Sequence, residues 1–108
     1  MLIRSIILAA AVAFVSFDAV AAGDPDSGKT LAARCSPCHG IDGVAKQPHV
    51  PNIAGESTIY LSKQLRAFRA GERQDPQMSL MAKPLSDEEI TDLVAWYSSI
   101  KFTVELPE

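Results

Sequence analysis

Two long segments without a regular hydrophobic pattern limit what this chain can fold into. The segment 40–56 is interrupted by glycine and proline at Gly40, Gly43, Pro48, Pro51 and Gly55. The segment 72–85 contains Pro76 and Pro84. Neither alternates between apolar and polar residues as a strand would. Structureless loops of about 15 residues are uncommon inside a small domain, so we expect a large apolar body other than side chains to organise them.

Three other segments carry helical patterns. Asp26 or Ser27 can cap a first helix, whose apolar residues fall within 29–35. Residues 57–70 place Tyr60, Leu61, Leu65 and Phe68 at helical spacing, and Gly71 stands where a C-cap belongs. The last helix begins with a capping box at Ser86 and Glu89 and continues to about Lys101. The sequence therefore predicts an all-α domain with three main helices and long loops.

The amino-terminal residues have the pattern of a secretory signal. A short positive region, Met1–Arg4, precedes an apolar run at 6–17 and the small residues of 19–22. The run is shorter than the about 20 residues that a membrane-spanning helix needs. We predict a signal peptide at 1–22, an exported domain at 23–108 and no stable membrane span after cleavage, while an uncleaved anchor remains an alternative.

Charge and motif content exclude several function classes. The chain has 108 residues, with ten Lys and Arg against thirteen Asp and Glu, for a net charge of −3. A nucleic-acid binder would carry a basic footprint, so no nucleic-acid partner is expected. We find no paired carboxylates, nucleophile triad or substrate-binding motif, and we predict that the chain is not an enzyme by itself. A domain this small usually needs a covalent or metal staple.

The only two cysteines, Cys35 and Cys38, lie three residues apart and directly before His39. A disulfide between them would close a very small loop and constrain the unfolded chain little. A thioredoxin-like pair belongs near a βαβ unit, which is not predicted here. A zinc site needs four ligands, and His49 is the only other histidine. These three uses of the pair are weak alternatives.

The pattern C-x-x-C-H is the signature of covalent haem attachment. On a helical turn the two thiols face the same way, toward the two vinyl groups of a porphyrin, and the following histidine is held under the iron. We therefore predict one haem c, bound through thioethers to Cys35 and Cys38, with His39 as an iron ligand. A haem is also the large apolar body that the two long loops require.

Several motifs in order resemble those of class I cytochrome c, in its small bacterial periplasmic branch. They are C-S-P-C-H-G, P-N-I-A-G, Y-L-x-K-Q-L, G-E-R, a methionine-bearing loop, and L-S-D-E-E-I before a helix with W-Y. The resemblance covers nearly all of residues 24–101. It implies a class I cytochrome c fold, in which the first and last helices pack together and the loops enclose one covalently bound haem.

The resemblance also implies the surroundings of the iron. Pro51 would accept a hydrogen bond from the second ring nitrogen of His39, which fixes the tautomer and raises the basicity of the ligand. Ile53 would pack on the haem face. Glu56 stands where relatives often carry glutamine, which adds negative charge near that surface.

A methionine on the other face of the iron would give His/Met ligation, which suits electron transfer. Met78 and Met81 are the two candidates left after signal cleavage. The position of the ligand in relatives favours Met78, with Met81 as a packing residue. His49 is read as a surface histidine, with bis-histidine ligation as its alternative.

The sequence and the resemblance predict a periplasmic electron carrier with His/Met-ligated iron, which exchanges electrons with donor and acceptor proteins as a monomer or weak dimer. The first alternative is a haem c subunit of a larger oxidoreductase complex. The second is a ligand-binding or sensing cytochrome, which requires that neither methionine binds the iron.

Overall fold

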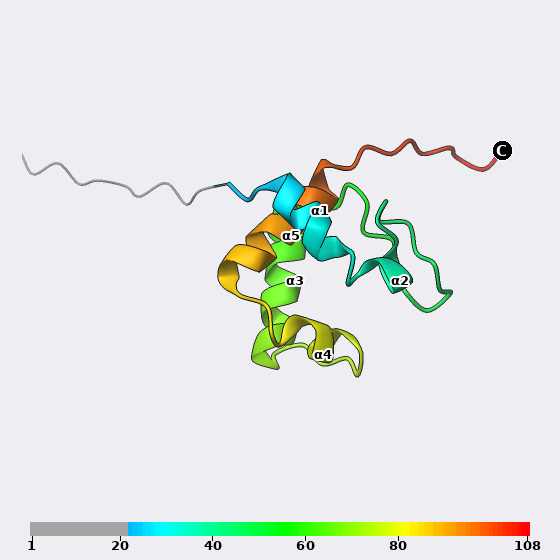
Figure 1. Cartoon of the computed structure of the whole chain (residues 1–108). Coiled ribbons are helices and arrows are strands. Elements are labelled where there is room, and N and C mark those ends of the chain that lie inside the picture. Colours follow the sequence, from blue (N-terminus) through cyan, green and yellow to red (C-terminus); the bar gives the residue numbers. More distant parts are fainter. Residues whose placement is uncertain (1–21) are drawn as a thin grey trace, which may run out of the picture.

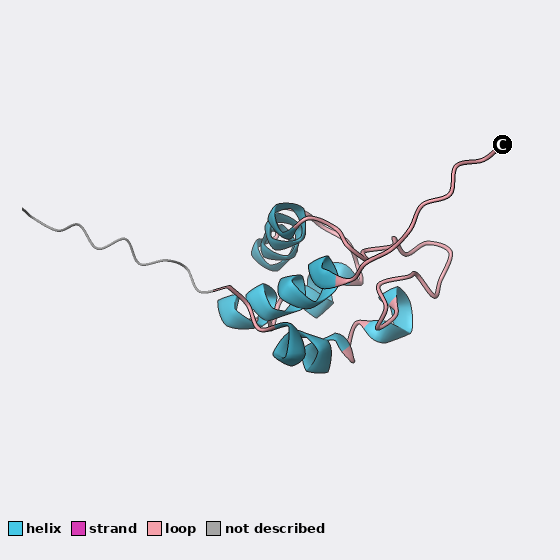
Figure 2. Cartoon of the chain, turned by 90° about the horizontal axis from the view of Figure 1, so that it is seen from above, coloured by secondary structure: helices cyan, strands magenta, loops and turns pink. Residues whose placement is uncertain are grey.

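Every regular element in the part of the chain that the structure describes is a helix. In this computed structural model, residues 22–108 are described (Figures 1 and 2), so the predicted signal lies outside the described residues except for Ala22. The elements in order are α1 (Pro25–Ala32), α2 (Ser36–His39), α3 (Thr58–Ala70), α4 (Met78–Ala82) and α5 (Asp87–Ser99). The all-α prediction is confirmed. None of the described helices is long and apolar enough to cross a membrane.

The first and last helices pack tightly against each other, as predicted (Figure 1). Gly28 permits this approach, because a Cβ atom added there would lie 1.9 Å from the backbone oxygen of Asp92 and 3.0 Å from Cβ of Trp96. The amino end of α1 is also held by α5, since the backbone N–H of Asp24 donates to Oδ1 of Asp92 at 2.8 Å. The sequence thus brings two segments from opposite ends of the domain into contact at a glycine.

Helix α3 begins and ends where the sequence predicts, and α5 begins where predicted but ends at Ser99, before the expected end near Lys101. The hydroxyl of Ser57 accepts from the N–H of Tyr60, and α3 ends at Gly71, whose φ of 78° is left-handed. At α5, the Ser86 hydroxyl accepts from the Glu89 N–H, and the Glu89 carboxylate accepts from the Ser86 N–H, which completes the predicted capping box.

Two helix starts differ from the prediction. Helix α1 is capped by Asp24, whose side chain accepts from the N–H of Asp26. Pro25 is the first residue of the helix. The segment predicted to be irregular contains α4, and Asp75 Oδ1 accepts from the N–H groups of residues 77 and 78 at the start of that helix. Proline is favourable at the start of α1, because it lacks the N–H that would be unpaired in the first turn. Helix α4 has Gln77 at its N-cap, without a side-chain cap, and Pro76 precedes the helix.

A small core joins these helices. Its buried residues form one cluster, consisting of Ala32, Leu61, Leu85, Ile90, Leu93, Val94 and Tyr97. Helix α3 is tied to α5 at the surface because Arg66 and Arg69 both pair with Asp87, Arg69 at 2.6 Å. Arg69 also donates to the backbone oxygen of Leu85 at 2.9 Å. Contacts at Leu85 and at Asp87 thus hold the segment after α4 against α3. Residues 102–108 form an exposed tail.

Candidate haem site

The three residues of the C-x-x-C-H pattern lie on one tight turn. Cys35 precedes α2, and its backbone oxygen accepts from the N–H of Cys38 at 3.2 Å and from that of His39 at 2.9 Å. Both cysteines are free thiols and half-buried. The structure therefore keeps both sulfur atoms available for bonding on the same element as the imidazole.

His39 is the one buried polar or charged residue among those described. Its ring Nδ1 lies 2.9 Å from the backbone oxygen of Pro51. A carbonyl can only accept, so Nδ1 carries the proton and the lone pair is on Nε2. No protein partner for Nε2 occurs within residues 22–108, and no buried side-chain nitrogen or oxygen of that part lacks one. Nε2 therefore opens onto accessible space.

The loop that carries Pro51 is folded back onto the cysteine turn. Gly43 O accepts from the N–H groups of Ile53 and Ala54, at 2.8 and 3.1 Å. The side chain of Asn52 accepts from the N–H of Ala45 at 2.7 Å. Gly43 has φ of 71°, and a Cβ there would lie 2.6 Å from Ala54 N. These ties explain how the chain returns to His39 after twelve residues.

Two adjacent aromatic residues of α5 hold the backbone directly after His39. Tyr97 OH donates to Gly40 O at 3.2 Å, and Trp96 Nε1 donates to Ile41 O at 3.0 Å. Tyr97 is 4% exposed. From the sequence, Trp96 and Tyr97 could contact the haem or its propionates, or belong to the core with one polar end at the surface. Their partners lie more than fifty residues away along the chain, and no local pattern could have indicated them.

Burial controls the protonation of the groups beside this turn. Desolvation raises the pKa of the Cys35 thiol, and the positive charge of Arg34 opposes this only in part. Desolvation also raises the pKa of Tyr97 well above its ordinary range, and the nearby Cys35 adds to this. Both groups therefore keep their protons at neutral pH, and the phenol of Tyr97 remains a hydrogen-bond donor.

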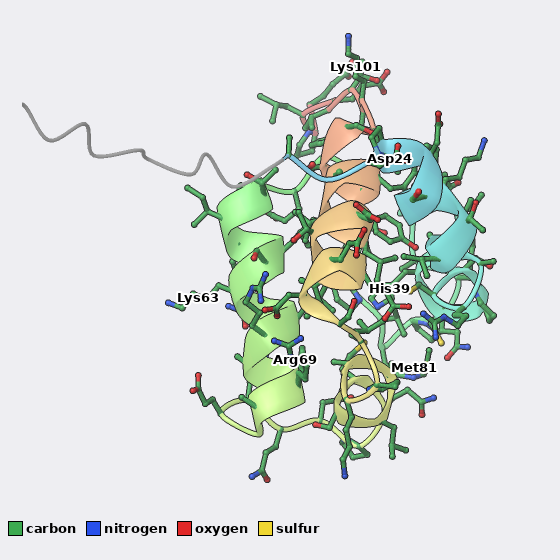
Figure 3. All side chains as sticks on the ribbon, turned by 60° about the vertical axis from the view of Figure 1, so that its left-hand side comes forward. Asp24, His39, Lys63, Arg69, Met81 and Lys101 are labelled. Atoms are coloured by element: carbon green, nitrogen blue, oxygen red, sulfur yellow. The ribbon has the colours of Figure 1, made fainter. Side chains whose placement is uncertain are left out.

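The two candidate methionines both lie on α4. Met78 is its first residue, Met81 follows one turn later, and both are half-buried. Neither belongs to the core cluster or to the side chains packed against it, so neither acts as core filling. In Figure 3, α4 with Met81 lies beneath the turn that bears His39. His49 is exposed, as predicted for a surface histidine.

A separate open groove runs between the carboxyl end of α3 and α4. Its lining includes Phe68, Arg69, Leu80 and Lys83. None of the predicted cofactor-binding residues lines it. We therefore assign the cofactor to the surroundings of His39 and not to this groove.

The donor set around His39 fits a haem c. Two free thiols lie on one turn with an imidazole whose Nδ1 is paired and whose Nε2 is open. Ile53 and Leu65 are half-buried apolar side chains that pack against the core. Among the described residues no cluster of three or more His, Cys, Asp or Glu side chains could hold a metal ion, which disfavours the zinc alternative.

Comparisons with known proteins agree with this assignment. The profile of the family "Cytochrome c" matches residues 25–101. Cytochrome c-554(548) of Halomonas halodenitrificans is 42% identical over 81 residues, which cover 72% of this chain and 98% of the relative. A protein of Thiomonas intermedia described as "Thiosulfate dehydrogenase electron acceptor" is 44% identical over 71 residues, or 65% of this chain and 33% of that one.

A solved structure gives the same fold. Reduced recombinant cytochrome c4 from Pseudomonas stutzeri superposes with a TM-score of 0.70 and 38% identity, over 77% of this chain and 48% of the other. This chain thus spans about half the length of that relative. The chain belongs to the cytochrome c family, a family of electron carriers. It binds one haem c covalently through its pair of cysteines.

Proposed function

We propose that this chain is a periplasmic electron carrier whose haem iron is bound by His39 and Met78. The observation that carries the proposal is the 2.9 Å contact between His39 Nδ1 and the oxygen of Pro51. This contact fixes the tautomer that leaves Nε2 free to bind iron, and it raises the basicity of the ring. The haem supplies a one-electron Fe(III)/Fe(II) couple.

A rigid binding site favours electron transfer, because fixed ligands keep the reorganisation energy small. The cysteines tether the cofactor, and His39 is held on the side of Pro51 by a loop tied at Gly43 and Asn52. His39 and Met78, held in place by their loops and helix, would hold the iron of the haem in both oxidation states, so that electron transfer would need little reorganisation of the protein. The small core and the half-buried Ile53 provide a surrounding of low polarity.

Met78 is proposed as the sixth ligand of the iron, and Met81 as a packing residue that does not bind it. The choice follows the position of the ligand in relatives. Asp75 fixes the start of α4, since its carboxylate accepts from the backbone N–H of Met78 at 2.8 Å. Met78→Ala should abolish the weak red absorption band that reports iron–sulfur bonding in the oxidised protein, and Met81→Ala should retain it. The reverse result would assign the iron to Met81.

Two controls belong to the same experiment. His49→Ala should leave the spectrum unchanged, because His49 is exposed. Carbon monoxide should bind slowly to the reduced wild-type protein at neutral pH and faster to Met78→Ala. Rapid binding to the wild-type protein would instead support a ligand-binding cytochrome with an open sixth position.

The periplasmic location rests on the predicted signal at 1–22. Cleavage after Ala22 would leave residues 23–108, which include every residue of the described site. Amino-terminal sequencing of the exported protein should begin at Gly23. A mature chain that begins at Met1 would contradict the export proposal.

A second candidate function is that of a haem c subunit in a larger oxidoreductase. The relative described as a thiosulfate dehydrogenase electron acceptor favours it. Both functions use the same site. They differ in whether the chain forms a stable complex with its redox partner. Purification from the native host at high salt distinguishes them, because a stoichiometric catalytic partner that survives this step supports the subunit, and a chain recovered alone supports the free carrier.

A further inference from the structure

Tyr97 contacts two loop segments that are distant from it in sequence. Its hydroxyl donates to Gly40 O at 3.2 Å, and its backbone oxygen accepts from the N–H of Gly55 at 2.9 Å. Gly40 directly follows His39, and Gly55 lies four residues after Pro51. One residue of α5 therefore holds both segments whose meeting point is the contact between His39 and Pro51.

We propose that Tyr97 is a positioning residue that sets the geometry of the His39–Pro51 hydrogen bond, and through it the electron density that the imidazole gives to the iron. Trp96 assists by holding the next carbonyl of the same turn, that of Ile41, at 3.0 Å. This inference rests on the proposed role of His39 as an iron ligand.

The turn after His39 has little conformational freedom, so a change in the hydrogen bond from Tyr97 to Gly40 should also affect the position of His39. Gly40 has φ of 74°, and a Cβ there would lie 2.6 Å from the backbone oxygen of Val44. The backbone oxygen of Cys38 accepts from Lys46 N–H at 2.8 Å on the other side of the turn. Tyr97 itself is buried in the core cluster, so its side chain has little freedom to move. A shift of the carbonyl of Gly40 therefore moves the adjacent ring of His39.

The direction of the electronic effect follows from the hydrogen bond. A strong bond from Nδ1–H to the oxygen of Pro51 makes the ring more basic and stabilises the oxidised iron. Loss of the anchor at Gly40 should lengthen this bond, lower the ring's basicity and raise the reduction potential. Other ties, at Gly43 and Asn52, remain in place, so a partial effect is expected.

Tyr97→Phe in the haem-loaded protein tests this, because it removes only the hydroxyl and keeps the ring and the backbone bond to Gly55. Hydrogen exchange of the His39 Nδ1–H, followed by NMR in the reduced state, should become about two- to tenfold faster, as expected for weakening one ordinary hydrogen bond. The reduction potential should rise. Tyr60→Phe is the matched control, since Tyr60 is 47% exposed, and it should change neither quantity.

A purely structural role for Tyr97 would lower the stability and leave both readouts at the wild-type value, and that result would overturn the proposal. If Tyr97→Phe yields no haem-loaded protein, Trp96→Phe carries the test. It should give a smaller change in the same directions, and unchanged exchange and potential would then overturn the proposal. Failure of His39 ligation itself is distinguishable, because the wild-type spectrum would already lack the signature of a low-spin iron with two axial ligands.

Discussion

Two arginines and one aspartate form a cluster of ion pairs at the surface of this protein. Arg66 and Arg69 of α3 converge on a single carboxylate, Asp87, at the start of α5. Hydrogen bonds from Arg69 and then Arg66 lower the pKa of Asp87. Isolated surface ion pairs contribute little, but here two guanidinium groups share one carboxylate and join two helices.

Replacement of Asp87 should change how stability depends on pH. The pKa of Asp87 is lower in the folded protein, so its contribution is present above the unfolded-state pKa of about 3.9 and is lost as the pH falls through the folded-state pKa. Asp87→Asn should therefore be less stable than the wild-type protein at about pH 7, and the difference should shrink at about pH 2.5. Urea unfolding midpoints at both pH values measure this.

Glu88→Gln is the matched control. Glu88 is the exposed neighbour of Asp87 and forms no ion pair within the described part of the chain. It should follow the wild-type protein at both pH values. Equal stability of Asp87→Asn and Glu88→Gln at neutral pH would contradict the role of the cluster.

The site residues differ in how far the sequence could predict them. Cys35, Cys38 and His39 lie within five residues of one another, and their spacing alone indicated the chemistry. Pro51 required the resemblance to a family, because a carbonyl acceptor has no side-chain signature. The contact of Tyr97 with Gly40 could not be predicted, since it depends on how α5 docks and not on any local pattern.

At the scale of elements, the crossing of α1 and α5 determines the framework. Gly28 brings the two backbones so close that any side chain there meets the carbonyl of Asp92. Gly28→Ala should destabilise the protein by about 1–3 kcal/mol, the usual cost of overpacking. Urea unfolding of the haem-loaded protein measures it.

Gly71→Ala makes the same chemical change in a different setting. Gly71 has φ of 78°, and a Cβ there meets nothing within 4 Å. Its cost should come from the left-handed backbone alone, about 1–2 kcal/mol. If Gly28→Ala were no more destabilising than Gly71→Ala, close contact between α1 and α5 would not be the reason for the glycine.

Helix starts were predictable where a serine cap and periodic apolar residues coincide, as at Ser57 and Ser86. The start of α1 was missed at Asp24, where the cap is an aspartate followed by a proline that is favourable at the first helical position. The start of α4 was missed because its N-cap, Gln77, makes no side-chain capping bond, and Pro76 before it was read as a breaker. Helix α4 has only five residues, which is too short to show a helical period.

For the molecule as a whole, the described residues provide a small core. Only Ile90 is a large side chain that is fully buried, and several apolar residues stay exposed, including Ile59 and Leu80. A core of this kind supplies little stability by itself. The covalent haem c is therefore expected to contribute much of the stability of the folded state.

Removal of the attachment should therefore unfold the chain. The double variant Cys35→Ala/Cys38→Ala, exported under the same conditions, should lose most of its helical circular dichroism and its cooperative thermal transition. The exposed-site variant His49→Ala should retain both. A sharp transition with wild-type helicity in the double variant would show that the polypeptide folds without covalent haem.

The sequence predicted two long irregular segments around a large apolar partner. The first, 40–56, has a helix in no part of it, whereas the second contains α4 and contributes Ala82 and Leu85 to the buried residues. The sequence could not predict their path. The hydrogen bonds that fold residues 43–54 back onto themselves involve backbone groups and the side chain of Asn52. Such contacts are set by three-dimensional packing, which composition and spacing do not encode.

A visible spectrum tests most directly whether a haem tethered by Cys35 and Cys38 has its iron bound by His39 and Met78. The protein should be exported in a host with working cytochrome maturation, and its oxidised, reduced and pyridine-treated forms recorded. We expect a pyridine adduct typical of thioether-linked haem and a red iron–sulfur band in the oxidised form. A colourless product would contradict this expectation.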